Sequence, residues 1–163
     1  KVDRETMREI VDIARWAPSW VNYQIARYTL VDDEEIIKEI AEHGVNGFVY
    51  NIDTLRTAKG VAVLSFVKGK SGTYDKEYIT SKGNSWEVFD AGIACQTFCL
   101  AAHAKGVGTC IMGVIDDKSI AKIVNLPEDE TVAALIVYGY EDGEHAAPNK
   151  RKDVDEIMRF VDR

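Results

Sequence analysis

The segment over residues 86–105 constrains the fold more than any other part of this chain. Apolar side chains from Trp86 to Leu100 lie at helical spacing along one side, and small residues, mostly alanines, cover much of another. A helix that is apolar nearly all round has to be buried on most of its sides. We therefore expect a long central helix, or one packed in an interface between subunits, with Gly106 at its C-terminal cap.

Helices and strands elsewhere in the chain follow one another without a strict βαβ rhythm. The apolar patterns predict helices over residues 3–16, 32–42, 117–124 and 153–161, and strands over 27–31, 60–67, 107–112 and 131–140. Asp32 and Glu35 form a plausible capping box for the second helix. Residues 69–84 predict a surface excursion, either a ligand-site rim or a plain variable loop. This order favours an α+β layered fold in a single domain over residues 1–163.

Composition is that of an ordinary globular domain. The chain has 163 residues, of which 46% are hydrophobic and 29% charged, and its formal net charge is −7. An acidic protein gains nothing from counterion release on nucleic acid, so nucleic-acid binding is not expected. No apolar run is long enough to span a bilayer, and no signal-peptide pattern is present. We expect a cytoplasmic protein with reduced thiols, because the three cysteines make an odd number.

Side chains suited to catalysis are scarce. Cys95, Cys99 and His103 share one helix face, but their neighbours are apolar, so packing is favoured over a metal site. His43 and His145 show no metal-ligand pairing, so no metal is predicted. Asp90 is polar among apolar residues and fits either a role in orienting backbone or basic groups, or a solvated helix start. This scarcity favours a protein whose chemistry belongs to a bound cofactor.

A polar turn over residues 15–24 separates the first helix from the first strand. Pro18 disfavours helix at the residue before it, so the helix has to end nearby. Ser19, Asn22 and Gln24 then supply a hydroxyl and two amides beside the apolar Trp20. Such a surface suits a ring-shaped ligand with hydrogen-bonding edges. A turn whose polar groups only cap the backbone is the alternative interpretation.

The turn resembles the signature of the nitroreductase family of flavin enzymes, roughly Ala-Pro-Ser-x-x-Asn-x-Gln-Pro-Trp. The matching residues are Ala17, Pro18, Ser19, Asn22 and Gln24, whereas Ile25-Ala26 replaces the family's Pro-Trp. The resemblance implies a central mixed β-sheet flanked by helices, a long buried central helix, and a homodimer with FMN at the subunit interface. The cofactor-binding residues implied for this turn are Pro18, Ser19, Trp20 and Asn22, which would face the flavin of the partner subunit.

A second segment, residues 106–113, is similar to the family's Gly-Leu-Gly-x-x-x-x-Gly sequence. The resemblance implies that Ile111, Met112 and Gly113 lie at the flavin and that the backbone N–H groups of Met112 and Gly113 point at its N5 and O4. A fixed amide donor there stabilises charge that develops on the reduced ring. A tight connection that needs glycine for positive φ is the alternative.

The third segment, residues 148–157, is similar to the family's C-terminal basic cluster. The resemblance implies that Lys150 and Arg151 bind the FMN phosphate, and Arg suits the bidentate grip that phosphate oxygens allow. Asn51 is a weaker match to an amide near the flavin edge, and a role in loop structure is the alternative. The family's basic opening arm precedes the point where this sequence starts.

The resemblance implies an FMN-dependent oxidoreductase. NADH or NADPH would give hydride to flavin N5, and a nitroaromatic, a quinone or a related electrophilic small molecule would then take it, in a ping-pong cycle. The flavin would do the chemistry, so no side chain is assigned as catalytic. A non-catalytic protein of the same fold that binds flavin or another ligand is the alternative.

Overall fold

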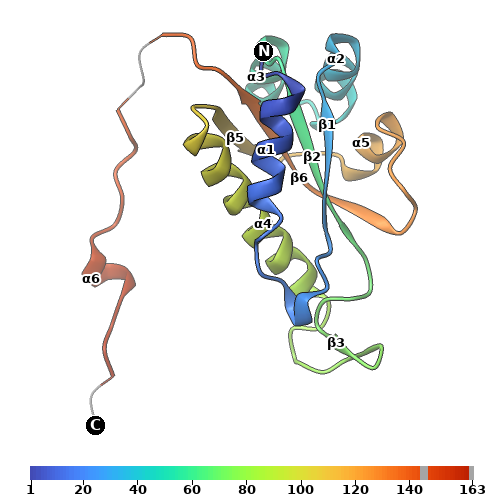
Figure 1. Cartoon of the computed structure of the whole chain (residues 1–163), viewed down its shortest axis with the longest axis vertical. Helices are drawn as coiled ribbons and strands as arrows, with labels where there is room; N and C mark the ends of the chain where they lie inside the picture. Colours follow the sequence, from blue (N-terminus) through green and yellow to red (C-terminus); the bar gives the residue numbers. More distant parts are fainter. Residues whose placement is uncertain (144–146, 162–163) are drawn as a thin grey trace.

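Helices cover both faces of a four-stranded β-sheet in the computed structural model (Figure 1), which describes residues 1–143 and 147–161. The strands are β1 (Ala26–Val31), β2 (Val61–Val67), β5 (Gly108–Met112) and β6 (Glu130–Gly139), in the spatial order β1-β2-β6-β5. The three pairings of this sheet are antiparallel. The expected helix-flanked central sheet is therefore confirmed, and its strand pairings in the described part of the chain are antiparallel.

Alternation along β2 divides the core into two layers. The helices are α1 (Arg4–Ala14), α2 (Glu34–His43), α3 (Val49–Thr57), α4 (Ser85–Ala104), α5 (Asp117–Ile123) and α6 (Val154–Ile157). Ala62 and Leu64 join the cluster beneath α1 and α4, whereas Val61 and Val63 join the cluster beneath α2, α3 and α5. Because β2 is buried on both faces, its sequence shows a continuous apolar run instead of alternation.

The long helix α4 confirms the prediction for residues 86–105, displaced by one residue. Its side toward the sheet is closely packed, with Phe98 and Ala102 fully buried. The opposite side carries Val88, Phe89 and Leu100, whose side chains are 61%, 57% and 59% exposed. Within one chain, therefore, the helix is buried on one side only, although its sequence is apolar nearly all round.

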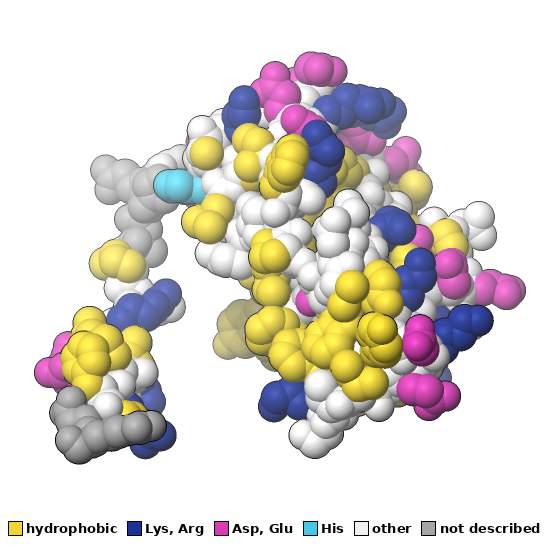
Figure 2. All heavy atoms as spheres, turned by 60° about the horizontal axis from the view of Figure 1, so that its bottom comes forward, with side chains coloured by type: hydrophobic (Ala, Val, Ile, Leu, Met, Phe, Trp, Pro, Cys, Tyr) yellow, Lys and Arg dark blue, Asp and Glu magenta, His cyan; other side chains and the backbone are white. Residues whose placement is uncertain are grey.

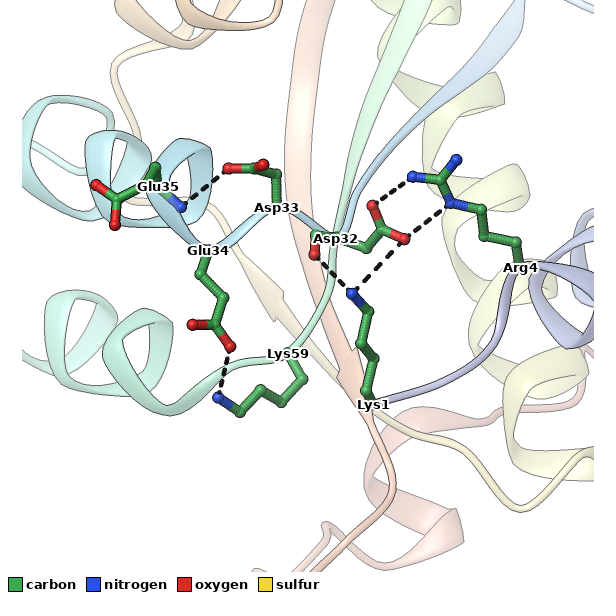
Figure 3. A network of polar contacts seen from close by, with 7 residues as sticks. All are labelled: Lys1, Arg4, Asp32, Asp33, Glu34, Glu35 and Lys59. Carbon is green, nitrogen blue, oxygen red and sulfur yellow. Dashed lines mark hydrogen bonds and ion pairs between the residues drawn. The ribbon is translucent and has the colours of Figure 1, made fainter.

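Helix α2 begins one residue later than predicted, because Asp33 rather than Asp32 is its N-cap. The Asp33 carboxylate accepts hydrogen bonds from the backbone N–H groups of Glu35 and Ile36. Asp32 instead receives the Arg4 guanidinium through two hydrogen bonds, of 2.9 and 2.8 Å, which join α1 to the end of β1 (Figure 3). The two neighbouring aspartates thus have separate roles.

Two other predicted segments differ from the observed structure. Residues 49–57, for which no element was predicted, form α3, and the helix expected over residues 153–161 is only the single turn of α6. The excursion over residues 69–84 carries the short hairpin of β3 (Thr73–Tyr74) and β4 (Glu77–Tyr78), but Ser71 and Thr73 in it are buried. None of the helices in the described residues is long and apolar enough to cross a membrane.

Candidate functional site

The turn after α1 is held in an unusual backbone conformation. After Pro18 the chain forms a single 3₁₀ turn, Trp20–Asn22, in which Val21 and Asn22 have φ of 47° and 55°, and Gln24 follows with φ of 50°. Positive φ is uncommon in residues other than glycine and carries strain, most of all in a β-branched residue such as Val21. The surrounding contacts must therefore fix this turn.

Hydrogen bonds from three directions hold the turn. The Ser19 hydroxyl accepts a hydrogen bond from the backbone N–H of Gln24, 2.8 Å away. The backbone N–H of Trp20 donates to the carboxylate of Asp90 on α4, and the Trp20 indole donates to the carbonyl of Thr73, each at 2.9 Å. Ser19 and Trp20 are half-buried, and Pro18 and Asn22 are exposed. The turn thus presents Asn22 at the surface while Ser19 and Trp20 stabilise it.

A pocket of about 310 Å³ opens beside this turn. Its lining includes Pro18 and Ser19 from the turn, Tyr28 from β1, and Asp90 from α4. The Tyr28 hydroxyl donates to the Ala94 carbonyl, and burial raises the pKa of Tyr28 to about 12. That hydroxyl therefore keeps its proton at neutral pH and acts as a donor.

The end of β5 forms the second candidate region. The Met112 side chain is buried in the cluster beneath α2, α3 and α5, so only its backbone is available to a ligand at this edge strand. Gly113 is exposed, and a Cβ atom placed there would meet no described residue within 4 Å other than its two chain neighbours. Its φ is not positive, so the alternative of a tight connection that needs glycine for positive φ fails at Gly113, although it holds at Gly106 directly after α4, whose φ is 73°. Open space above a glycine fits a ligand that lies close to the backbone.

Asn51 lies next to this region, where its side chain forms a hydrogen bond that stabilises the backbone after β5. Its side chain on α3 is buried and donates from the amide to the carbonyl of Val114, at 3.0 Å. Asn46 donates in the same way to the carbonyl of Ile115, at 2.9 Å. Ile111, by contrast, is half exposed and lines an apolar pocket of about 290 Å³ with Val88 of α4.

Lys150 and Arg151 lie in the C-terminal segment, residues 147–161, which extends away from the sheet and its helices (Figure 1). Both are exposed, and the Arg151 guanidinium donates to the carbonyl of Asn149 at 2.9 Å. The segment also exposes apolar side chains, with Ile157 and Phe160 at 71% and 82%. The two cations are therefore not beside Gly113 or the turn of their own chain.

The predicted site residues accordingly fall into three groups. Asn51, Met112 and Gly113 meet at the end of β5, with Met112 in the core layer of α2, α3 and α5. The turn is bonded to α4, in the opposite layer, and the two cations stand apart on the C-terminal segment.

The structure does not support a metal site at the cysteine and histidine pattern of α4. In residues 1–143 and 147–161 no group of three His, Cys, Asp or Glu side chains could hold a metal ion. Cys95, Cys99 and Cys110 are free thiols, and His145 lies outside the described residues. Asp90 agrees with the interpretation that it orients backbone, because it is 4% exposed and accepts the backbone N–H of Trp20, so the alternative of a solvated helix start is wrong. Sequence reasoning did not identify Trp20 as its partner. Ser71, which also bonds to Asp90, gave no signal.

Comparison with known proteins identifies the family. The model of the nitroreductase family matches residues 1–140, and the chain therefore belongs to the nitroreductase family, a family of oxidoreductases. The chain is 24% identical to MhqN of Bacillus subtilis strain 168, which carries a provisional NAD(P)H nitroreductase name, over 98% of this chain and 89% of the relative.

Solved structures of the family share the fold. A nitroreductase family protein of Streptococcus pneumoniae TIGR4 superposes with a TM-score of 0.83 at 20% identity, covering 98% of this chain and 90% of that chain. An FMN-dependent nitroreductase of Clostridium difficile R20291 gives a TM-score of 0.76 at 25% identity, covering 98% and 88%. The nitroreductase-like fold expected from the sequence is confirmed.

Proposed function

We propose that this chain is an FMN-dependent oxidoreductase that takes hydride from NADH or NADPH and reduces nitroaromatic, quinone or related electrophilic small molecules in a ping-pong cycle. Family membership supports the oxidoreductase class, and the names of MhqN and of the Clostridium difficile protein support NAD(P)H and FMN. When bound, FMN supplies the redox chemistry. The observation that carries the proposal is the family match over residues 1–140, and the exposed Gly113 at the end of an edge strand leaves room for a ligand close to the backbone.

The end of β5 would hold the reactive part of the cofactor. The backbone N–H groups of Met112 and Gly113 would donate hydrogen bonds to the ring, where fixed donors stabilise the charge that develops on reduction. Asn51 would position these donors, because its amide holds the next carbonyl, that of Val114. Ile111, half exposed, would contribute apolar surface.

The C-terminal cations would bind the phosphate. Arg151 and Lys150 are exposed, and neither takes part in an ion pair among the described residues, so both are available to an anion. Arg offers two parallel donors to phosphate oxygens and Lys adds a compact charge. The chemistry of these donors fits an FMN phosphate.

A homodimer would complete the site. The turn is bonded to α4, whereas the Met112 side chain is buried in the layer of α2, α3 and α5. We therefore propose that Pro18 to Asn22 of one copy face the flavin held by β5 of the other. The exposed apolar side of α4 supports such an interface. On the face shown in Figure 2, hydrophobic side chains also gather over the end of the molecule with the β3–β4 hairpin, and again on the C-terminal segment.

Substitution of Gly113 tests this proposal directly. Apart from its two chain neighbours, no residue lies within 4 Å of a Cβ placed at Gly113, so Gly113→Ala should leave thermal unfolding nearly unchanged. Thermal unfolding of Gly113→Leu is measured alongside it. We expect Gly113→Leu to weaken FMN binding at least tenfold, roughly 1.4 kcal/mol, with Gly113→Ala between it and the unaltered protein. Equal FMN affinity in all three proteins would contradict the assignment.

Turnover separates the enzyme from its alternative. The FMN-loaded protein should oxidise NADH or NADPH steadily once a quinone or nitroaromatic is added. Bound FMN without turnover would instead support the non-catalytic flavin-binding protein of the same fold.

A further inference from the structure

Two carboxylates on one face of α4 are almost completely buried. Glu87 is 5% exposed and Asp90 is 4% exposed. Burial of a carboxylate is costly unless hydrogen bonds replace its water. Each of them therefore has to serve contacts that repay this cost, and their partners differ.

Asp90 joins two segments that are far apart in the sequence. A single oxygen, Oδ2, accepts hydrogen bonds from the backbone N–H of Trp20 at 2.9 Å and from the hydroxyl of Ser71 at 2.5 Å. Ser71 is completely buried. Two residues further on, the Thr73 carbonyl accepts the Trp20 indole N–H. The carboxylate thus stands where the turn, the excursion and α4 meet.

The turn needs such an anchor, because its backbone is strained at Val21, Asn22 and Gln24. Strain of this kind persists only where the surroundings over-determine it. Trp20 is the first residue of the 3₁₀ turn, and its N–H donates to the Asp90 carboxylate. A hydrogen bond to a charged acceptor is stronger than one to a neutral acceptor. A tilted ring contact adds to the anchor, since the ring centroids of Trp20 and Trp86 lie 5.0 Å apart at an interplanar angle of 48°.

We propose that Asp90 is a positioning residue for the cofactor-binding turn, holding the backbone of Trp20 so that Ser19 and Asn22 keep the conformation that meets the flavin. This inference rests on the proposed function, which makes the turn part of the FMN site. Asp90 would affect FMN binding only by positioning the turn, without contacting the cofactor.

Glu87 offers a matched control three residues earlier on the same helix. It is equally buried, but its carboxylate accepts from the backbone N–H of Gly69 and so holds the excursion, with no bond to the turn. Glu87→Ala and Asp90→Ala therefore remove similar buried carboxylates with different partners. Asp90→Asn is the conservative variant, because its amide oxygen can accept both hydrogen bonds that Oδ2 now accepts.

FMN titration of the full chain, with hydrogen exchange of residues 16–24, tests the inference. We expect Asp90→Ala to raise the FMN dissociation constant about tenfold and to speed exchange in the turn. We expect Asp90→Asn to restore most of the affinity, and Glu87→Ala to change it less than about twofold at a comparable loss of thermal stability.

Three outcomes would overturn the inference. They are unchanged affinity in Asp90→Ala, equal losses in Asp90→Ala and Glu87→Ala, and turn exchange that does not respond to Asp90→Ala. Failure of the unaltered chain to bind FMN is a different result, because it would overturn the proposed function first. A response of turn exchange to Asp90→Ala alone would then still show that Asp90 anchors the turn.

Discussion

Individual polar residues of the candidate site mostly hold backbone. Ser19 fixes the N–H of Gln24, Asn51 fixes the carbonyl of Val114, and Asp90 fixes the N–H of Trp20. Such bonds leave backbone donors and a few exposed side chains to meet a ligand. This division of roles suits a protein whose reaction belongs to a cofactor, since the chain then contributes orientation and electrostatics.

At the residue scale, Arg151→Ala should weaken FMN binding. Loss of charged hydrogen bonds to the phosphate should raise the dissociation constant about thirtyfold, roughly 2 kcal/mol, and should leave folding unchanged because Arg151 is exposed. Arg159→Ala on the same segment removes an equal charge from another exposed position and is the matched control. Equal effects of the two variants in a fluorescence titration would refute the phosphate assignment.

The sequence predicted residues with a clear motif and missed those that act through partners. The turn, Gly113 and the basic pair could be proposed from the sequence because short signatures mark them. The partners of Asp90 were not, because Ser71 and Trp20 meet it only after folding. The alternative reading of Asn51 as structural agrees with its hydrogen bond, although it lies on a helix where loop was expected.

At the element scale, predictions succeeded where a long apolar run marks the element. α4, β2 and β6 are long or doubly buried, so their apolar patterns are unambiguous. α3 was missed because it buries only Asn51 and Leu55, which leaves little periodicity. The helix expected over residues 153–161 is short because nothing in the described chain packs against its apolar residues, and short helices depend on such packing.

The contact between α1 and the end of β1 predicts a dependence of stability on acid. The hydrogen-bonded Arg4 guanidinium holds the pKa of Asp32 below its ordinary value of 3.8. In acid the unfolded chain therefore binds a proton at Asp32 before the folded chain does. The contribution is present above about pH 4 and is lost as pH falls through the folded-state pKa.

Denaturant unfolding of Arg4→Met across this range checks the prediction. The free energy of unfolding should fall less steeply below about pH 4 in Arg4→Met than in the unaltered protein. Arg8→Met, on the same helix, is the control, because Arg8 makes no ion pair among the described residues. Identical acid slopes for all three proteins would contradict a role of the Arg4–Asp32 pair.

At the scale of the whole molecule, one chain leaves apolar surface uncovered and its site residues divided. The outer side of α4 and the C-terminal segment are exposed. The turn is bonded to α4, whereas the Met112 side chain is buried in the layer of α2, α3 and α5. A second copy would cover the apolar surface and would also bring the separated site residues together. For this reason the dimer is central to the proposed function.

A charged substitution on the exposed side of α4 should separate the two copies. We expect Leu100→Lys to give monomers by light scattering at micromolar concentration and to lose FMN, because burial of a lysine in an apolar interface is unfavourable. Ile36→Lys, at an exposed apolar position of α2, should remain dimeric and bind FMN. A monomeric unaltered protein that binds FMN normally would exclude the two-copy site.

The FMN site is tested by the visible absorption spectrum of the purified protein, desalted before and after incubation with FMN. We expect a flavin band that stays with the protein after the second desalting and is lost in Gly113→Leu. A colourless protein after incubation with FMN would contradict the FMN site.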